Sequence, residues 1–387
     1  MNWKLIVYGI TSKLANSFEN SEKSRIWFLL VYPNYPKGVY HQITLVPMTF
    51  FLKSRFGLSF DLSDPISKVA QWASDADGKY DHVFVTDSHL IWRDAYAALA
   101  ACAMKTESIK IGVGVTNPYT RHVSVTANAI ATIDELSKGR ATLGIGAGRT
   151  ALYNMHKKPV AVKEVRKAVL AIRSLIRGEE TLYEGTKLRS RWSKRDIPIY
   201  IAGTGPKILQ LAGEIADGAI LGMGAYPPLI KYAIEEIRVG VRRANRSIDN
   251  FPIWVTTVCC ISDDTQFAKR EASYYAATLA MAASKLASIN EKAASTLTPE
   301  LRVDVDRCNE AYNYYQHLKS DASQVSEVSD RVVDAFTIYG STSDCVRKFD
   351  RVFDEVSVAG FSLGTYSFSD KSSFIEAFAR DIIPSFS

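Results

Sequence analysis

Short apolar segments alternate with helical segments from Phe56 almost to the end of this 387-residue chain. The alternation predicts parallel strand–helix units, because a parallel strand pair needs a long crossover connection. Eight such units over roughly 300 residues favour an α/β fold, a closed (β/α)₈ TIM-like barrel, with an open doubly wound sheet as the alternative. We expect strands over 56–60, 82–86, 109–115, 141–145, 197–202, 219–221, 253–260 and 362–366, and helices over 65–76, 94–104, 123–136, 162–176, 206–215 and 229–244.

The regular alternation stops between residues 263 and 340. Helical pieces are expected there over 264–289, 299–319 and 325–336, which gives a helical insertion after the seventh strand. An insertion at this point lies on the face where barrel active sites form and is typical of a lid. An added structural or dimer-forming layer is the other interpretation. The insertion carries several tyrosines, among them Tyr274, Tyr275, Tyr312, Tyr314 and Tyr315.

Composition narrows the class of protein. Hydrophobic residues make up 47% and charged residues 23% of the chain, which is typical of a globular protein. The chain has no run of about 18 apolar residues, so we expect no membrane span. Five cysteines without a framework spacing indicate a reducing, cytoplasmic setting. The net charge of +6 is not gathered in a basic stripe, so we expect no nucleic-acid partner, and no recurring Cys/His or carboxylate/His spacing predicts a metal.

Residues 1–47 differ from the rest of the chain. They hold an apolar aromatic stretch over 27–32, followed by Pro33 and Pro36, and lack the cleavage-site layout of a signal peptide. Two hypotheses stay open. Either these residues form an extension of uncertain structure, or translation of the natural protein starts at Met48. The predicted barrel domain spans residues 48–387.

The loop after the second strand holds two candidate catalytic residues. Active sites of (β/α)₈ barrels form where strands end, so the residues after each strand are the ones to inspect. Asp87 stands at such a position and suits a cofactor contact or proton handling, although capping of the next turn is the plain alternative. His89 is a candidate proton relay, although a loop histidine is more often simply solvated.

Three further loops are rich in glycine. Asn117 follows the third strand and offers a donor and an acceptor to the edge of a heterocycle. The fourth strand leads into Gly146-Ala147-Gly148, whose spacing is not that of a dinucleotide fingerprint. The fifth strand leads into a helix start that predicts an anion site, because glycine N–H groups and the helix dipole favour a phosphate; it comprises Ala202, Gly203, Thr204, Gly205, Pro206 and Lys207.

Three stretches carry a family resemblance. They are IGVGVTNP with TRH over 111–122, ATIDELSKGRATLGIGAG over 131–148, and GTGP followed by AGEIADG over 203–218. Through them the chain resembles the luciferase-like family of flavin- and deazaflavin-dependent oxidoreductases, and within it the branch around methylenetetrahydromethanopterin reductase. The resemblance extends over residues 56–386 and is weakest in the helical insertion.

The resemblance implies a TIM-like barrel that binds coenzyme F420, or alternatively FMN, at its carboxyl face. It places the family's non-prolyl cis peptide bond at Gly114–Val115, behind the cofactor ring. It assigns cofactor contacts to Asp87, Asn117 and the stretch Gly146, Ala147 and Gly148. It assigns the phosphate loop to the stretch Ala202, Gly203, Thr204, Gly205 and Pro206.

Two departures from the family pattern concern the substrate. Ser59 stands where the reductase branch has an acid, and Arg149 stands where the sugar-phosphate dehydrogenase branch has one. Arg149 predicts an anionic substrate or cofactor tail. We therefore expect an oxidoreductase that transfers a hydride between reduced deazaflavin and a small organic substrate, in a homo-oligomer as the family implies. A monooxygenase that uses reduced FMN and a non-catalytic flavin-binding relative are the alternatives.

Overall fold

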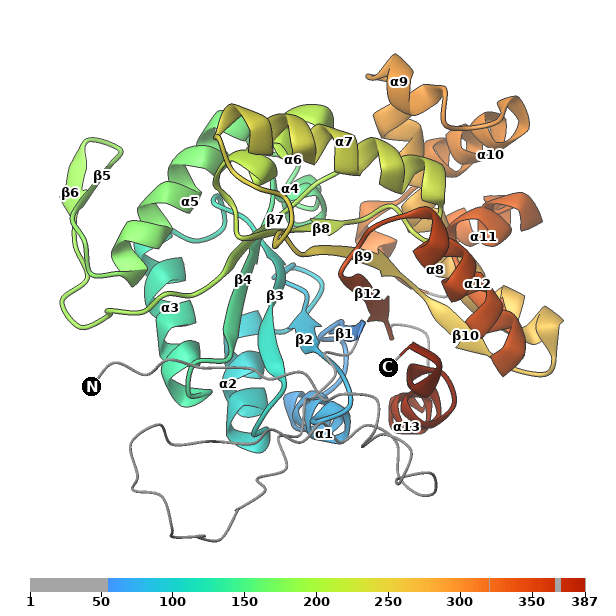
Figure 1. The fold of residues 1–387 in the computed structure, drawn as a ribbon, viewed down its shortest axis with the longest axis horizontal. Coiled ribbons are helices and arrows are strands. Elements are labelled where there is room, and N and C mark those ends of the chain that lie inside the picture. Colours follow the sequence, from blue (N-terminus) through green and yellow to red (C-terminus); the bar gives the residue numbers. More distant parts are fainter. Residues whose placement is uncertain (1–54, 320, 366–369, 387) are drawn as a thin grey trace, which may run out of the picture. The chain divides into compact units, whose positions relative to one another are not determined.

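Eight parallel strands close into a barrel in the computed structural model, which describes residues 55–319, 321–365 and 370–386 (Figure 1). Their order around the barrel is β1-β12-β9-β8-β7-β4-β3-β2, and β1 pairs with β2 to complete the ring. The predicted (β/α)₈ barrel is therefore confirmed. The barrel strands are β1 (Phe56–Phe60), β2 (His82–Val85), β3 (Lys110–Thr116), β4 (Ala141–Ile145), β7 (Ile199–Ala202), β8 (Gly218–Leu221), β9 (Ile253–Thr257) and β12 (Gly360–Gly364).

Amphipathic helices cover the outside of the barrel (Figure 1). In α5 (Val162–Ile176) the buried side chains include Val165, Val169, Ile172 and Ile176, a spacing that makes one continuous apolar stripe. Packing of this stripe against the strands removes it from water, which is the main stabilising contribution. The other covering helices are α1 (Ile66–Ala76), α2 (Ala95–Lys105), α3 (Val123–Leu136), α6 (Pro206–Ile215), α7 (Pro227–Arg243), α12 (Thr342–Glu355) and α13 (Lys371–Asp381).

An aromatic cluster joins the first strand to the last helices. The fully buried ring of Phe56 lies edge-on to Phe349 and Phe378, with ring centroids 5.0 Å apart in both pairs. Phe386 contacts the same ring at 5.4 Å. Each edge-to-face pair adds roughly 1 kcal/mol beyond the burial of its area, so the cluster fixes the two ends of the barrel sequence together.

The predicted seventh strand is wrong in its length. β9 ends at Thr257, and β10 (Cys259–Ile261) leaves the barrel to pair in parallel with β11 (Ile338–Gly340). The Oγ1 of Thr257 donates to the carbonyl of Phe336 at 2.9 Å, and the N–H of Ile338 donates to the carbonyl of Val258 at 3.0 Å. The returning end of the insertion therefore pairs with the Val258 carbonyl, a backbone group that a longer β9 would have paired within the barrel.

The insertion between these two strands consists mainly of helices, as predicted. It comprises α8 (Thr265–Ala287), α9 (Glu291–Ala294), α10 (Pro299–Glu310), two 3-10 turns (Tyr314–Gln316 and Ser323–Glu327) and α11 (Asp330–Phe336). The helix predicted over 299–319 ends at Glu310, and the one predicted over 325–336 begins at Asp330. The elements that were not predicted include the hairpin of β5 (Thr181–Tyr183) and β6 (Thr186–Leu188), the short helices α4 (Arg149–Tyr153) and α9, the strand β11, and the helices α12 and α13.

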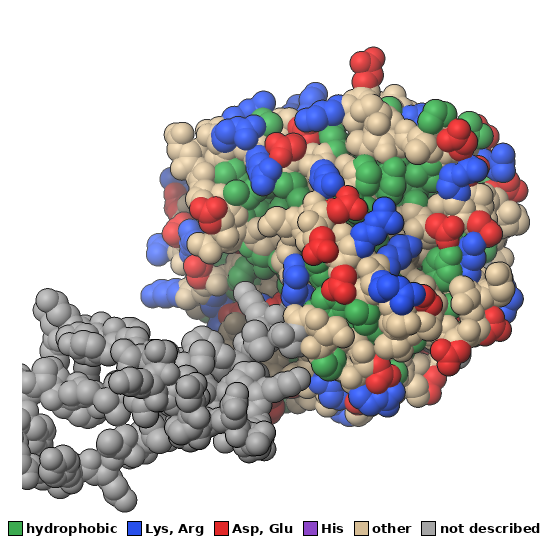
Figure 2. Space-filling model, turned by 45° about the vertical axis from the view of Figure 1, so that its right-hand side comes forward, with side chains coloured by type: hydrophobic (Ala, Val, Ile, Leu, Met, Phe, Trp, Pro, Cys, Tyr) green, Lys and Arg blue, Asp and Glu red, His purple; other side chains and the backbone are tan. Residues whose placement is uncertain are grey.

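On the face shown in Figure 2, basic and acidic side chains are interspersed, with small apolar areas between them. Among the described helices, none has the length and apolar character needed to cross a membrane. The last strand, predicted over 362–366, is β12, which begins two residues earlier and ends at Gly364. The hypotheses on residues 1–47 and Met48 lie outside the described residues.

Candidate active site

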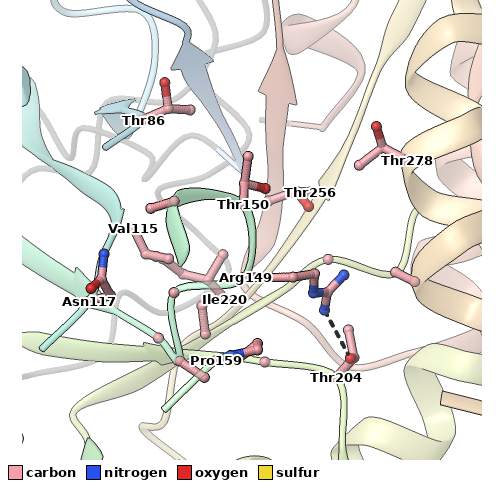
Figure 3. Close-up of a pocket in the computed structure, with 18 of the residues that line it drawn as sticks. Thr86, Val115, Asn117, Arg149, Thr150, Pro159, Thr204, Ile220, Thr256 and Thr278 are labelled. Atoms are coloured by element: carbon pink, nitrogen blue, oxygen red, sulfur yellow. Dashed lines mark hydrogen bonds between the residues drawn. The ribbon is translucent and has the colours of Figure 1, made fainter. Parts of the chain in front are cut away.

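A cavity of about 520 Å³ lies at the carboxyl ends of the barrel strands, where the sequence placed the site (Figure 3). Its walls come from the loops after the strands and from α8 and Leu318 of the insertion. His89 does not line the cavity and is exposed, and Pro206 opens α6 just outside it. Most of the predicted residues do line it: Asp87, Gly114, Val115, Asn117, Gly146, Ala147, Gly148, Ala202, Gly203, Thr204 and Gly205.

The peptide bond between Gly114 and Val115 is cis, as the resemblance implies. The register between β3 and β4 shifts between Val113 and Thr116, so this part of β3 bulges out of the ladder. A Cβ at Gly114 would lie 2.8 Å from the Cβ of Phe84, which leaves room only for glycine. Gly114 and Val115 are half-buried in an otherwise mostly buried strand, because they face the cavity.

Asp87 is held in place by two neighbours. Its Oδ2 accepts a hydrogen bond from the Oγ1 of Thr116 at 2.7 Å and pairs with Nη1 of Arg121 at 2.5 Å. Nη2 of the same guanidinium lies 2.8 Å from Asp94, the residue that caps α2. Oδ1 of Asp87 has no hydrogen-bond partner within the described ranges. The carboxylate therefore brings a fixed negative charge to the cavity wall.

The two polar atoms of the Asn117 carboxamide have different roles, one in the turn after β3 and one at the cavity. Its Oδ1 accepts from the backbone N–H groups of Tyr119 and Thr120, both at 3.0 Å, and so closes the turn after β3. The Nδ2 group has no protein acceptor among the residues that the structure describes. The expected donor is thus free for a ligand, whereas the expected acceptor is used by the turn.

The glycines in the loops that line the cavity leave space that a side chain would fill. Gly148 adopts a left-handed φ of 80°, and a Cβ there would meet Leu152 at 2.7 Å and Asn117 at 2.8 Å. At Gly205, by contrast, a Cβ would meet no atom within 4 Å. Gly205 caps the amino end of α6, whose unpaired N–H groups favour an anion. The guanidinium of Arg149 reaches across from α4 and donates to the Oγ1 of Thr204 at 3.4 Å (Figure 3).

The insertion contributes His317, which the sequence did not single out. The ring is enclosed by protein, and part of its surface stays open to the cavity it lines. Nδ1 is hydrogen-bonded to the hydroxyl of Tyr312, which lies 2.9 Å from the Oγ1 of Thr278. Trp92, also on the cavity wall, has its ring centroid 5.9 Å away. Burial first, and the charge of Arg149 second, lower the pKa of His317 to about 3, so the imidazole is neutral near pH 7.

Comparison with known proteins identifies the family. The model of the luciferase-like monooxygenase family matches residues 48–359. The chain belongs to this family. A 5,10-methylenetetrahydromethanopterin reductase from Methanolobus tindarius is 30% identical over 338 residues, covering 85% of this chain and 99% of that protein.

Solved structures support the same fold. The coenzyme F420-dependent tetrahydromethanopterin reductase from Methanopyrus kandleri has a TM-score of 0.70 at 24% identity and covers 87% of this chain and all of that one. An F420-dependent secondary alcohol dehydrogenase has a TM-score of 0.68 at 18% identity, with the same coverage. The predicted resemblance to the luciferase-like family is confirmed.

The two halves of the stretch over 131–148, which carries part of the family resemblance, have different roles. Its second half, from Gly144 onward, leads into the cavity loop. Its first half lies at the opposite end of β4, where Arg140 donates to the carbonyls of Ser137, Thr106 and Ile109 at 2.7, 2.7 and 2.6 Å. This half is structural.

No group of three or more side chains suited to a metal occurs in the part of the chain that the structure describes.

Proposed function

We propose that this chain is a coenzyme F420-dependent oxidoreductase that transfers a hydride between the coenzyme and a small organic substrate. The observation that carries the proposal is the glycine-lined cavity at the carboxyl ends of the strands, with the cis Gly114–Val115 bond in its wall. It is supported by the similarity over nearly the whole length of a protein named as a methylenetetrahydromethanopterin reductase. Two further similar proteins are named as F420-dependent dehydrogenases, and dehydrogenases are oxidoreductases.

The residues present fit a deazaflavin with an anionic tail. Val115 and Ile220 give the cavity apolar walls, as a tricyclic ring requires. Thr86 also lines the cavity, and its Oγ1 is buried without a hydrogen-bond partner among the described residues. Gly205 and the first turn of α6 would hold the phosphate of the tail.

Coenzyme F420 supplies or accepts the hydride when it is bound. The chain itself orients the ring against Val115 and excludes water with the α8 side chains Leu279, Met281 and Ala282. Asp87 presents a fixed charge, and Asn117 presents its N–H donor. These contributions position the reactants without taking part in the electron transfer.

His317 is the group of the insertion placed to handle a proton. Tyr312 occupies Nδ1, so Nε2 is the ring nitrogen left for a substrate atom. A neutral imidazole can donate its Nε2 proton there as Nδ1 takes the hydroxyl proton of Tyr312, and Thr278, which lines the cavity, can return a proton to Tyr312 from cavity water. His89 is a weaker candidate, because it is exposed and does not line the cavity.

Turnover tests this proposal. The full-length protein is mixed with reduced coenzyme F420 and a panel of imines, ketones and enones, and the return of the oxidised coenzyme's absorbance is followed without oxygen. Oxidation that depends on one substrate class supports hydride transfer and names the class. Turnover with reduced FMN and oxygen alone would instead favour the monooxygenase alternative.

Light scattering tests the predicted homo-oligomer, and fractionation of cells tests the predicted cytoplasmic location.

A further inference from the structure

Two cationic side chains meet beside the cavity without an acidic partner. Arg149 starts α4 and lines the cavity, and Lys285 projects from α8; both are half-buried. Over the described residues, neither has a carboxylate within ion-pair distance. Asp306 is close in the fold, but it accepts from Ser284 and pairs with Arg302. A half-buried charge without a partner is costly, so a ligand that supplies the opposite charge is favoured.

The two cations share their neighbours. Nη1 of Arg149 lies 3.9 Å from the Sδ of Met281, and the hydroxyl of Tyr314 lies 3.3 Å from the same sulfur. Lys285 donates to that hydroxyl at 2.6 Å. Burial first, and the charge of Arg149 second, lower the pKa of Lys285. The two cations therefore repel each other, and an anion that contacts both would relieve the repulsion.

Aromatic rings form a wall around the pair. The Nζ of Lys285 lies 4.8 Å from the ring centroid of Tyr153 and 4.9 Å from that of Tyr314, and these two rings are 4.5 Å apart. Both tyrosines line a second cavity, of about 480 Å³. Asn154 lines it as well, and its Nδ2 is buried without a hydrogen-bond partner in the described part of the chain. Two cations and an amide donor therefore gather in this region, and no described carboxylate pairs with either cation.

We propose that Arg149 and Lys285 bind an anionic group, a phosphate or a carboxylate, of the ligand that occupies the cavity, with Tyr153 and Tyr314 as the wall of this subsite. The proposal rests on the proposed function, because the ligand is either the substrate or the coenzyme. Arg149 supplies a planar fork of donors that matches both kinds of anion, and Lys285 adds a point charge. The anion belongs either to the substrate or to the tail of coenzyme F420.

Binding measurements separate these two sources. The full-length protein and the variants Arg149→Gln and Lys285→Gln are titrated with coenzyme F420, with the deazaflavin core that lacks the phosphate-bearing tail, and with inorganic phosphate. Arg270→Gln removes an exposed cation from the same helix and is the matched control. Arg149→Lys keeps the charge and shows whether a loss comes from charge or from altered folding. Fluorescence reports deazaflavin binding, and calorimetry reports phosphate binding.

If the subsite holds the tail, each Gln variant weakens coenzyme F420 roughly tenfold or more and leaves the tail-less core unchanged. If it holds the substrate's anion, both deazaflavins bind unchanged, but phosphate binds the parent protein and the control and is lost in the Gln variants. Unchanged binding of both deazaflavins, together with phosphate binding that is absent or unaffected, overturns the proposal. Failure of the parent to bind any deazaflavin overturns the proposed function instead, and the phosphate titration still decides the subsite.

Discussion

The guanidinium of Arg121 lies 2.5 Å from the carboxylate of Asp87 and joins the cavity wall to the start of α2 through Asp94. The side chains of Arg121 and Asp87 are only 16% and 3% exposed, so removal of one leaves the other as a buried, poorly compensated charge. Burial lowers the pKa of Arg121, but the two carboxylates raise it more, and its pKa is raised overall.

We therefore expect Arg121→Met to lower the free energy of unfolding by about 3 kcal/mol and to weaken deazaflavin binding. Chemical denaturation and a fluorescence titration measure the two effects. Arg351→Met removes an exposed partner of Glu355 and should cost less than about 1 kcal/mol. Equal losses in both variants would contradict a special role for the Asp87–Arg121 pair.

Gly205→Ala tests whether the phosphate loop needs open space. The new Cβ meets no protein atom within 4 Å, so we expect the free energy of unfolding to fall by about 1 kcal/mol or less. The methyl group would occupy ligand space, and we expect coenzyme affinity to fall roughly tenfold. Gly185→Asn in the β5–β6 turn, where φ is 79° and a Cβ also meets no atom, is the control. An affinity equal to that of the control would remove Gly205 from the ligand site.

His317 makes stability depend on pH in a predictable direction. Its pKa is about 3 in the folded chain and near 6.5 when unfolded, so the unfolded state binds more protons below pH 6.5. This contribution to stability is complete above pH 6.5 and is lost as the pH falls toward 3. Relative to the parent, His317→Gln should gain roughly 2 kcal/mol in free energy of unfolding between pH 7.5 and 5.0.

Urea denaturation at the two pH values measures this difference. Burial also lowers the pKa of His82, but His82 is present in both proteins and its contribution cancels. Parallel pH profiles for parent and variant would show that the ring of His317 is solvated rather than enclosed.

Arg140→Met tests whether the first half of the stretch over 131–148 is structural and separate from the second half, which leads into the cavity. Loss of its hydrogen bonds to α2, α3 and the start of β3 leaves several buried carbonyls without donors. We expect the free energy of unfolding to fall by about 3 kcal/mol while the affinity for coenzyme F420 stays within a factor of about two. A large loss of affinity in folded protein would place Arg140 in the ligand site after all.

Local patterns in the sequence predicted most of the barrel. The strands over 56–60 and 141–145 and the helices over 123–136, 162–176 and 206–215 have their predicted bounds, because apolar periodicity and flanking glycines mark them locally. The strand predicted over 253–260 was too long, because its division depends on pairing with Ile338–Gly340, about 80 residues later. Such a pairing leaves no local signal.

The candidate site was predictable where it follows a strand. Asp87, Val115 and the glycine loops line the cavity because the barrel brings strand ends together. His317 reaches the cavity only through the path of the insertion, which no periodicity defines. The cluster of aromatic residues around it was the one available signal.

The most direct test of coenzyme F420 as the cofactor is a titration of the full-length protein with coenzyme F420 and with FMN, each oxidised and reduced, followed by fluorescence. We expect saturable binding of coenzyme F420 at least about tenfold tighter than that of FMN in either state. Tighter binding of reduced FMN would contradict the deazaflavin assignment and favour oxygen chemistry. Binding of neither would leave the barrel as a fold without the proposed function.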